Sequence, residues 1–129
     1  MKKTKKKLML GMAALLCASL SFTSAASAAT SVYGQVAGYS TSGYLSMGSS
    51  SATASTTCST VAGVSAYVAY TYYYNNFQTE TVTNNTSLGS TSVSTTASAK
   101  WVSVQSRYAT GSHSVTYQTQ YWSAGTSTQ

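Results

Sequence analysis

Residues 64–74 alternate between two sets of side chains, and this pattern constrains the fold more than any other feature of the chain. One set is apolar or aromatic and consists of Val64, Ala66, Val68, Tyr70, Tyr72 and Tyr74. Because side chains in a strand repeat with a period of two, the pattern predicts a β-strand with these residues on one face. Asn75 and Asn76 tolerate the positive φ of a tight turn, so residues 77–83 are expected to return as the hairpin partner.

Weaker alternation extends over most of the remaining chain. Further strands are predicted over residues 31–39, 44–47, 52–60, 91–97, 100–108 and 113–122, with polar turns at 40–43, 84–87 and 109–112. About seven short strands with evenly spaced turns predict an all-β fold. The expected fold class is a small antiparallel β-sandwich of immunoglobulin-like size, and a small barrel is the alternative. Residues from about 123 onward are expected to form a flexible tail.

The N-terminus has the three parts of a secretory signal peptide, predicted over residues 1–28. It opens with MKKTKKK, continues as an apolar segment over residues 8–20, and ends in the small residues Ala26, Ser27, Ala28 and Ala29. The apolar segment is too short to span a bilayer, which takes about 20 apolar residues. We expect cleavage after Ala28, so that residues 29–129 form one secreted, extracellular domain that meets the membrane only during export.

Cleavage at this site removes five of the seven basic residues and most of the formal net charge of +6. Lys100 and Arg107 then remain against Glu80, and two separate cations cannot displace the counterions of a nucleic acid. Nucleic acid is therefore excluded as a partner. Cys58 is the one cysteine left, so no intramolecular disulfide can form. The alternation around Cys58 predicts a buried thiol, and a disulfide between chains stays open as the alternative.

Groups that could carry catalysis are scarce. One carboxylate, Glu80, cannot supply the pair that glycoside hydrolysis uses, and a Ser-His-Asp triad lacks its aspartate. A Cys58–His113 dyad would need the one remaining cysteine to meet the one histidine, and a metal site would need every candidate ligand. His113 follows Gly111 and Ser112 and is expected to be a solvated turn residue. The sequence therefore predicts a protein that is not an enzyme and holds neither metal nor cofactor.

Tyrosines carry the clearest signal for binding. They fall on both faces of the strand predicted over residues 64–74, so they cannot all lie in the core. Tyr67 and Tyr73 are expected to lie half-exposed on the face opposite the apolar set. One interpretation is ordinary packing, and the other is an aromatic surface for sugar rings or a protein partner, since tyrosine provides contact area at low entropy cost.

The segment from residue 64 to residue 122 resembles the lactococcin-type bacteriocins, which fold as small β-sandwiches. The resemblance rests on SAYVAY at 65–70, VTNNT at 82–86, Trp101, and SVTYQTQYW at 114–122. It implies secretion and inhibition of related Gram-positive cells through binding of a cell-envelope precursor. This chain lacks the scattered His and Lys residues of those bacteriocins, and no binding residue is carried over. The chain is also similar to small Ser/Thr/Tyr-rich proteins that Gram-positive bacteria secrete.

These observations predict a secreted, non-catalytic β-sandwich that binds a cell-envelope, glycan or protein ligand at the cell exterior. A bacteriocin acting on related Gram-positive bacteria is the first alternative. A self-assembling extracellular structural protein is the second, because the low charge and the absence of proline leave sheet edges poorly protected against pairing. The sequence predicts neither the ligand nor the oligomeric state.

Overall fold

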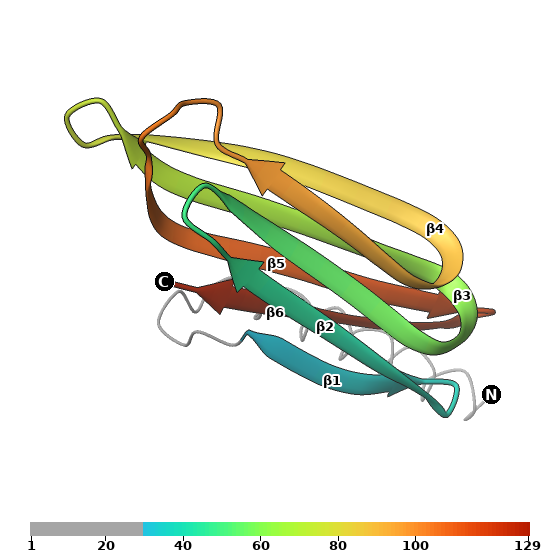
Figure 1. Ribbon diagram of the computed structural model, residues 1–129. Coiled ribbons are helices and arrows are strands. Elements are labelled where there is room, and N and C mark those ends of the chain that lie inside the picture. Colours follow the sequence, from blue (N-terminus) through green and yellow to red (C-terminus); the bar gives the residue numbers. More distant parts are fainter. Residues whose placement is uncertain (1–29) are drawn as a thin grey trace, which may run out of the picture.

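The computed structural model describes residues 30–129. The predicted signal peptide and its cleavage site, Ala26 to Ala29, lie outside the described residues. Within residues 30–129 all regular structure is antiparallel β-sheet, so the predicted all-β class is confirmed (Figure 1). The strands are β1 (Ser31–Val36), β2 (Tyr39–Met47), β3 (Ser51–Tyr74), β4 (Gln78–Ser98), β5 (Gln105–Tyr117) and β6 (Gln120–Thr128). This part of the chain has no helix that is long and apolar enough to cross a membrane.

The long hairpin of β3 and β4 folds back on itself and generates two layers (Figure 1). Its register shifts between Thr57 and Ala62, and immediately beyond the shift Gly63 faces Gly89 across the two strands. A bulge bends a strand, and glycine inside a strand often marks such a bend. The strands predicted separately over 52–60 and 64–74 are therefore the two arms of one bent strand.

Each arm of β3 belongs to a different layer. Strand β2 pairs with residues 52–58 of β3, whereas β5 pairs with residues 63–73. The first layer therefore runs β1-β2-β3-β4 and the second runs β6-β5-β3-β4. At the β1 and β6 edges of the two layers, at the same end of the sandwich as the bend, the Ala37 N–H donates to Gln120 Oε1 over 2.9 Å (Figure 1). This contact joins the β1–β2 turn to β6, and the sandwich is nearly closed, as in a barrel.

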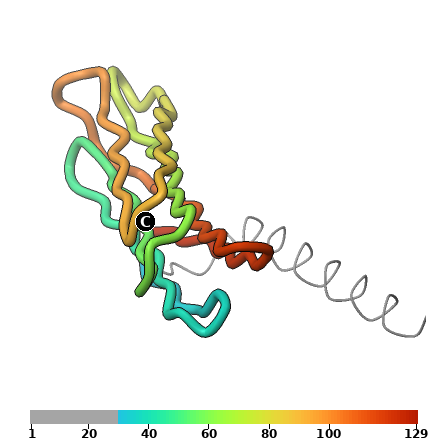
Figure 2. Tube along the Cα trace, turned by 90° about the vertical axis from the view of Figure 1, so that its right-hand side faces the viewer, coloured from blue at the N-terminus to red at the C-terminus, as the bar shows by residue number. Residues whose placement is uncertain are grey.

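The turns at the two ends differ from those predicted except at the tip of the long hairpin. That tip has positive φ at Asn75 and Asn76, as expected, and also at Phe77, where the sequence predicts the start of the returning strand. The first turn lies at Ala37 and Gly38, both with positive φ, so residues 40–43 belong to β2. Figure 2 separates the β1–β2 turn (cyan), at the foot of the view, from the β3–β4 turn and the β4–β5 loop at its top.

The predicted position of the turn in the C-terminal hairpin is wrong, and so is the pairing of its strands. Strand β5 runs straight through residues 109–112, and the turn lies at Gln118 and Thr119 instead. Gly111 serves packing, because a Cβ there would lie 2.5 Å from Thr126 Oγ1 of the neighbouring strand. The expected flexible tail from about residue 123 is also wrong, since β6 continues in register with β5 to Thr128.

The turn expected at residues 84–87 is likewise wrong, because these residues lie inside β4. The Asn84 side-chain amide donates to the Thr96 carbonyl over 2.8 Å and so links the two arms of β4, which lie in different layers. An Asn-rich segment that is typical of a turn thus connects the two layers of the sandwich along β4.

The core is graded along the long axis of the sandwich. Tyr70 and Tyr72 are fully buried near the end where the β4–β5 loop lies, and Tyr74 is partly buried beside them. Toward the middle, the inward positions hold small residues such as Ala54, Ala66 and Gly111. Cys58 is buried and has a free thiol, as predicted.

Candidate functional site

Tyr67 and Tyr73 both lie on the outer face of β3, where the alternation places them. Tyr67 is 37% exposed and Tyr73 is partly buried. Six residues of extended strand separate them, which corresponds to about 20 Å. The structure therefore confirms their exposure but does not bring the two rings into one site.

Tyr67 lies alone among small polar groups. Its cross-strand neighbours are Asn85 on β4 and Ser112 on β5. Together with Ser65 and Ser87 these residues line a shallow hollow on the outer face. This hollow offers hydroxyl and amide groups beside a single aromatic ring.

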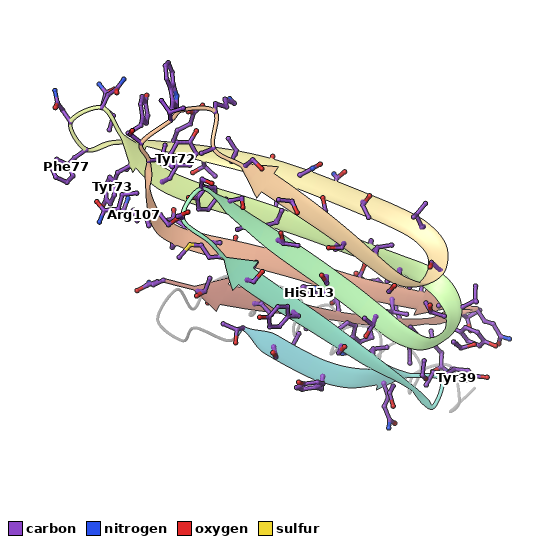
Figure 3. All side chains as sticks on the ribbon, in the orientation of Figure 1. Tyr39, Tyr72, Tyr73, Phe77, Arg107 and His113 are labelled. Carbon is purple, nitrogen blue, oxygen red and sulfur yellow. The ribbon has the colours of Figure 1, made fainter. Side chains whose placement is uncertain are left out.

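Tyr73 belongs to a larger group, which we call the aromatic–arginine cluster: Tyr73, Phe77, Arg107 and Tyr108. Figure 3 labels Tyr73, Phe77 and Arg107 near the β3–β4 turn. The Tyr73 and Phe77 rings meet edge to face, with centroids 6.0 Å apart. The Arg107 guanidinium carbon lies 5.3 Å from the Tyr73 ring centroid and 5.5 Å from that of Tyr108. Cation–π contacts at such distances hold an arginine side chain in place.

A bulge in β5 explains why Arg107 and Tyr108 can act together. Thr71 pairs with Tyr108 and Tyr72 pairs with Ser106, so Arg107 is the extra residue of the longer strand. Regular alternation would turn one of two consecutive residues inward, but a bulge re-aims a side chain. Both Arg107 and Tyr108 are consequently exposed.

Shallow hollows lie on both sides of the cluster. One is lined by Tyr73 and Phe77 together with the amides of Asn75, Asn76 and Gln105. The other is lined by Arg107 and Tyr108 together with Thr110 and residues 127–129 at the end of β6. The cluster thus borders two depressions, and Asn75, Asn76 and Gln105 give the first of them amide groups.

Glu80 forms a second polar group on the other side of the β3–β4 tip. Its Oε2 accepts from Tyr72 Oη over 2.8 Å and from Trp101 Nε1 over 2.9 Å, and its Oε1 accepts from Lys100 Nζ over 2.9 Å. Tyr72 Oη also accepts from the Lys100 N–H over 3.1 Å. The Trp101 ring stacks on Tyr74, nearly parallel, with centroids 5.3 Å apart. These contacts fasten the β4–β5 loop to the end of the sheet.

The charges of this group stabilise one another. The hydrogen bond from Lys100, followed by that from Tyr72, lowers the pKa of the Glu80 carboxyl. The Glu80 carboxylate in turn raises the pKa of Lys100. Burial, as the main cause, raises the pKa of the Tyr72 hydroxyl. Glu80 is therefore an ionised anchor for the loop at neutral pH.

His113 lies in the middle of β5, between the layers and with no exposed surface, so its prediction as a solvated turn residue is wrong (Figure 3). Its Nδ1 is hydrogen-bonded to Thr56 Oγ1 over 2.9 Å and its Nε2 to Thr126 Oγ1 over 2.8 Å. Both ring nitrogens thus have threonine partners, and neither is bonded to Cys58. Burial lowers the pKa of His113 to about 4, so the imidazole is neutral at pH 7.

Sequence reasoning missed three members of the aromatic–arginine cluster: Phe77, Arg107 and Tyr108. Phe77 could have been suspected, because a large ring in a tight turn of asparagines has little to pack against. Arg107 and Tyr108 depend on the bulge, and the bulge depends on how β5 meets β3. No local pattern in the sequence marks it.

In the described part of the chain, residues 30–129, no three His, Cys, Asp or Glu side chains lie close enough to hold a metal ion. The chain matches no protein-family model, no curated protein and no solved structure to which it was compared.

Proposed function

We propose that this chain is a secreted, non-catalytic binding module that acts at the cell exterior and meets its ligand at the aromatic–arginine cluster. One observation carries the proposal: an arginine and two tyrosine rings on the outer face of the sheet lie together with Phe77 of the β3–β4 turn, beside two hollows. Phe77 is 79% exposed, which leaves its apolar ring largely in water.

The arrangement suits binding because much of its order exists before the ligand arrives. Tyr73, Arg107 and Tyr108 stand on two paired strands, and their mutual contacts restrict their side-chain freedom. Association then immobilises few rotamers, and less of the interaction free energy is lost to ordering. Aromatic and arginine side chains also dominate the energetic centres of known interfaces.

Export follows from the predicted signal peptide over residues 1–28, which would release the domain into the medium. Binding should therefore be sought on the outside of cells, starting with Gram-positive cells and their isolated walls. The protein, purified as the expressing cell processes it, is expected to pellet with one of these fractions in a saturable manner. Absence of pelleting with any fraction would argue against an envelope ligand.

Substitution separates the cluster from the isolated tyrosine. Tyr73→Ala is expected to weaken pelleting at least tenfold, because it removes the ring that contacts both Phe77 and Arg107. Tyr67→Ala is expected to have a smaller effect, since Tyr67 stands alone. Tyr44→Ala, at an exposed tyrosine on β2 of the other layer, is the matched control and should bind normally. Unchanged binding in both Tyr73→Ala and Tyr67→Ala, with both proteins folded, would remove this face as the binding surface.

Self-assembly into an extracellular structure is a second candidate, and β4 favours it. Within the described residues β4 pairs with β3 alone, so its other edge has no strand partner along 21 residues. That edge contains no lysine and no proline, which commonly protect such edges. Concentration-dependent growth in size during ultracentrifugation would support assembly, and a monomer at every concentration would discard it.

A growth assay distinguishes a plain binding module from a bacteriocin, which is the function implied by the resemblance of residues 64–122. Inhibition of related Gram-positive strains by the purified protein would favour the bacteriocin. Envelope binding without inhibition would favour the plain module.

A further inference from the structure

We propose that the aromatic–arginine cluster recognises a sugar ring that carries a carboxylate, as in a polymer of uronic acids. The inference rests on the proposed function, because it names the ligand class of the same surface. It is carried by the combination of groups at the cluster: the exposed rings of Phe77 and Tyr108, neighbouring amide side chains, and one guanidinium that contacts Tyr73 and Tyr108.

The aromatic members match the apolar face of a sugar ring. A pyranose presents a patch of C–H groups above and below the ring, and tyrosine or phenylalanine faces provide flat apolar area for that patch. Phe77 and Tyr108 flank Tyr73 and Arg107 and keep exposed surface on both sides of the guanidinium.

Neighbouring amides match the hydroxyl groups of a sugar. Asn75, Asn76 and Gln105 line the hollow next to Tyr73 and Phe77. Each amide side chain can both donate and accept hydrogen bonds, as a sugar hydroxyl does. A ring stacked on the aromatic side chains would therefore find hydrogen-bond partners at its rim.

Arg107 favours a ligand that carries a negative charge. Its ring contacts use its positive charge and none of its five N–H donors as hydrogen bonds. The one carboxylate side chain of the described residues, Glu80, is already bound by Lys100, Trp101 and Tyr72. A planar guanidinium fork fits a carboxylate in a bidentate manner.

A carboxylated sugar fits better than a phosphate-linked chain because of where the groups lie. Arg107 contacts the rings of Tyr73 and Tyr108 directly. The negative charge of the ligand must therefore lie within a few bonds of the ligand ring that stacks on the aromatic side chains. A uronic acid has its carboxylate attached to the ring itself. A poly(glycerol phosphate) chain has charge but no ring to stack.

Polygalacturonate and its fully methyl-esterified form provide matched probes, since they share the same sugar backbone and differ in the carboxylate charge. The processed protein is expected to bind polygalacturonate at least tenfold more tightly than the methyl ester in calorimetric titration. This preference should shrink as salt is added, because exposed charges are screened. Equal affinity for the two polymers would overturn the inference, as would tighter binding of poly(glycerol phosphate).

Variants at residue 107 complete the test. Arg107→Gln is expected to abolish the tenfold preference for polygalacturonate over its methyl ester, whereas Arg107→Lys should retain only part of that preference because the fork is lost. Thermal unfolding of each variant shows whether it is folded. An undiminished preference in folded Arg107→Gln would overturn the assignment of the charge to this residue.

Failure of this inference is distinguishable from failure of the proposed function. Pelleting with cell walls that depends on Tyr73, without any preference for the carboxylated polymer, would overturn the ligand class and retain the binding module. Loss of both pelleting and polymer binding would overturn the two together.

Discussion

The middle of the sandwich and its aromatic end bury polar groups in opposite ways. In the middle, the imidazole of His113 is enclosed by Gly43, Gly111 and two threonine hydroxyls. At the aromatic end, the carboxylate of Glu80 lies near the surface and receives hydrogen bonds from large side chains. Glycine lets the layers approach until one ring fills the space, whereas tyrosines at the end hold a wider space open. Substitutions in the middle should therefore lower the stability of the whole domain, whereas substitutions at the aromatic end should loosen only the neighbouring loop.

The largest expected effect is that of Gly43→Ala. A Cβ at this position would lie 2.3 Å from Cγ of His113, whose ring is held on both sides by threonines. Overpacking of such a site is expected to lower the free energy of unfolding by about 3 kcal/mol. Chemical denaturation measures the loss.

Gly89→Ala is the matched control, because a Cβ at that position meets no atom within 4 Å. We expect a change of less than about 1 kcal/mol for it. Equal stability of the two alanine variants would show that the middle is not tightly packed and would end the comparison.

The next largest effect is expected from acidification, which should destabilise the middle of the sandwich. Burial lowers the pKa of His113 to about 4 in the folded chain, whereas the unfolded chain has a pKa of about 6.5. Between these values the unfolded state binds a proton that the folded state does not, so the free energy of unfolding falls as the pH decreases from 6.5 to 4. The full loss is about 3 kcal/mol.

Urea denaturation at a series of pH values measures this slope. His113→Gln removes the titrating group and should flatten the curve between pH 6.5 and 4, even though it lowers the overall stability. A slope that persists in folded His113→Gln would assign the pH dependence to another group.

The smallest global effect is expected for Glu80→Gln at the aromatic end. The change removes the charge that binds Lys100 and weakens the contact with Trp101, so the β4–β5 loop should loosen while the sheet stays intact. We expect a red shift of the Trp101 fluorescence and faster proteolysis between residues 99 and 104, with less loss of stability than in Gly43→Ala.

The stabilising contribution of the same carboxylate should be lost only at low pH. The pKa of Glu80 is lowered in the folded chain, so its contribution is complete above the ordinary carboxyl pKa and is lost as the pH falls through the lowered value. The fluorescence of Trp101 should therefore change below about pH 4.5 in the parent protein. A Glu80→Gln variant with the same acid transition would contradict this assignment.

Period-two alternation predicts the correct inward and outward faces for most strands. Val64 to Tyr72 of the apolar set lie inward, Tyr67 lies outward, and the turn at Asn75 and Asn76 occurs where positive φ is tolerated. Two of the wrongly predicted turns share one cause. Residues 84–87 and 109–112 have the composition of turns, yet contacts between the layers use their asparagine and glycine inside strands.

Period-two side-chain patterns are a local property, because successive side chains alternate between the two faces of a strand whichever strands lie beside it. The sequence alone therefore determined an all-β chain, the burial of Cys58, the exposure of Tyr67 and Tyr73, and the small number of ionisable groups outside the predicted signal peptide. The fold of the β3–β4 hairpin, the bulge that turns Arg107 and Tyr108 to the same face, and the enclosure of His113 were decided by tertiary structure. Each of these depends on which strands meet and in which register, and that choice is made by packing between residues far apart in the chain.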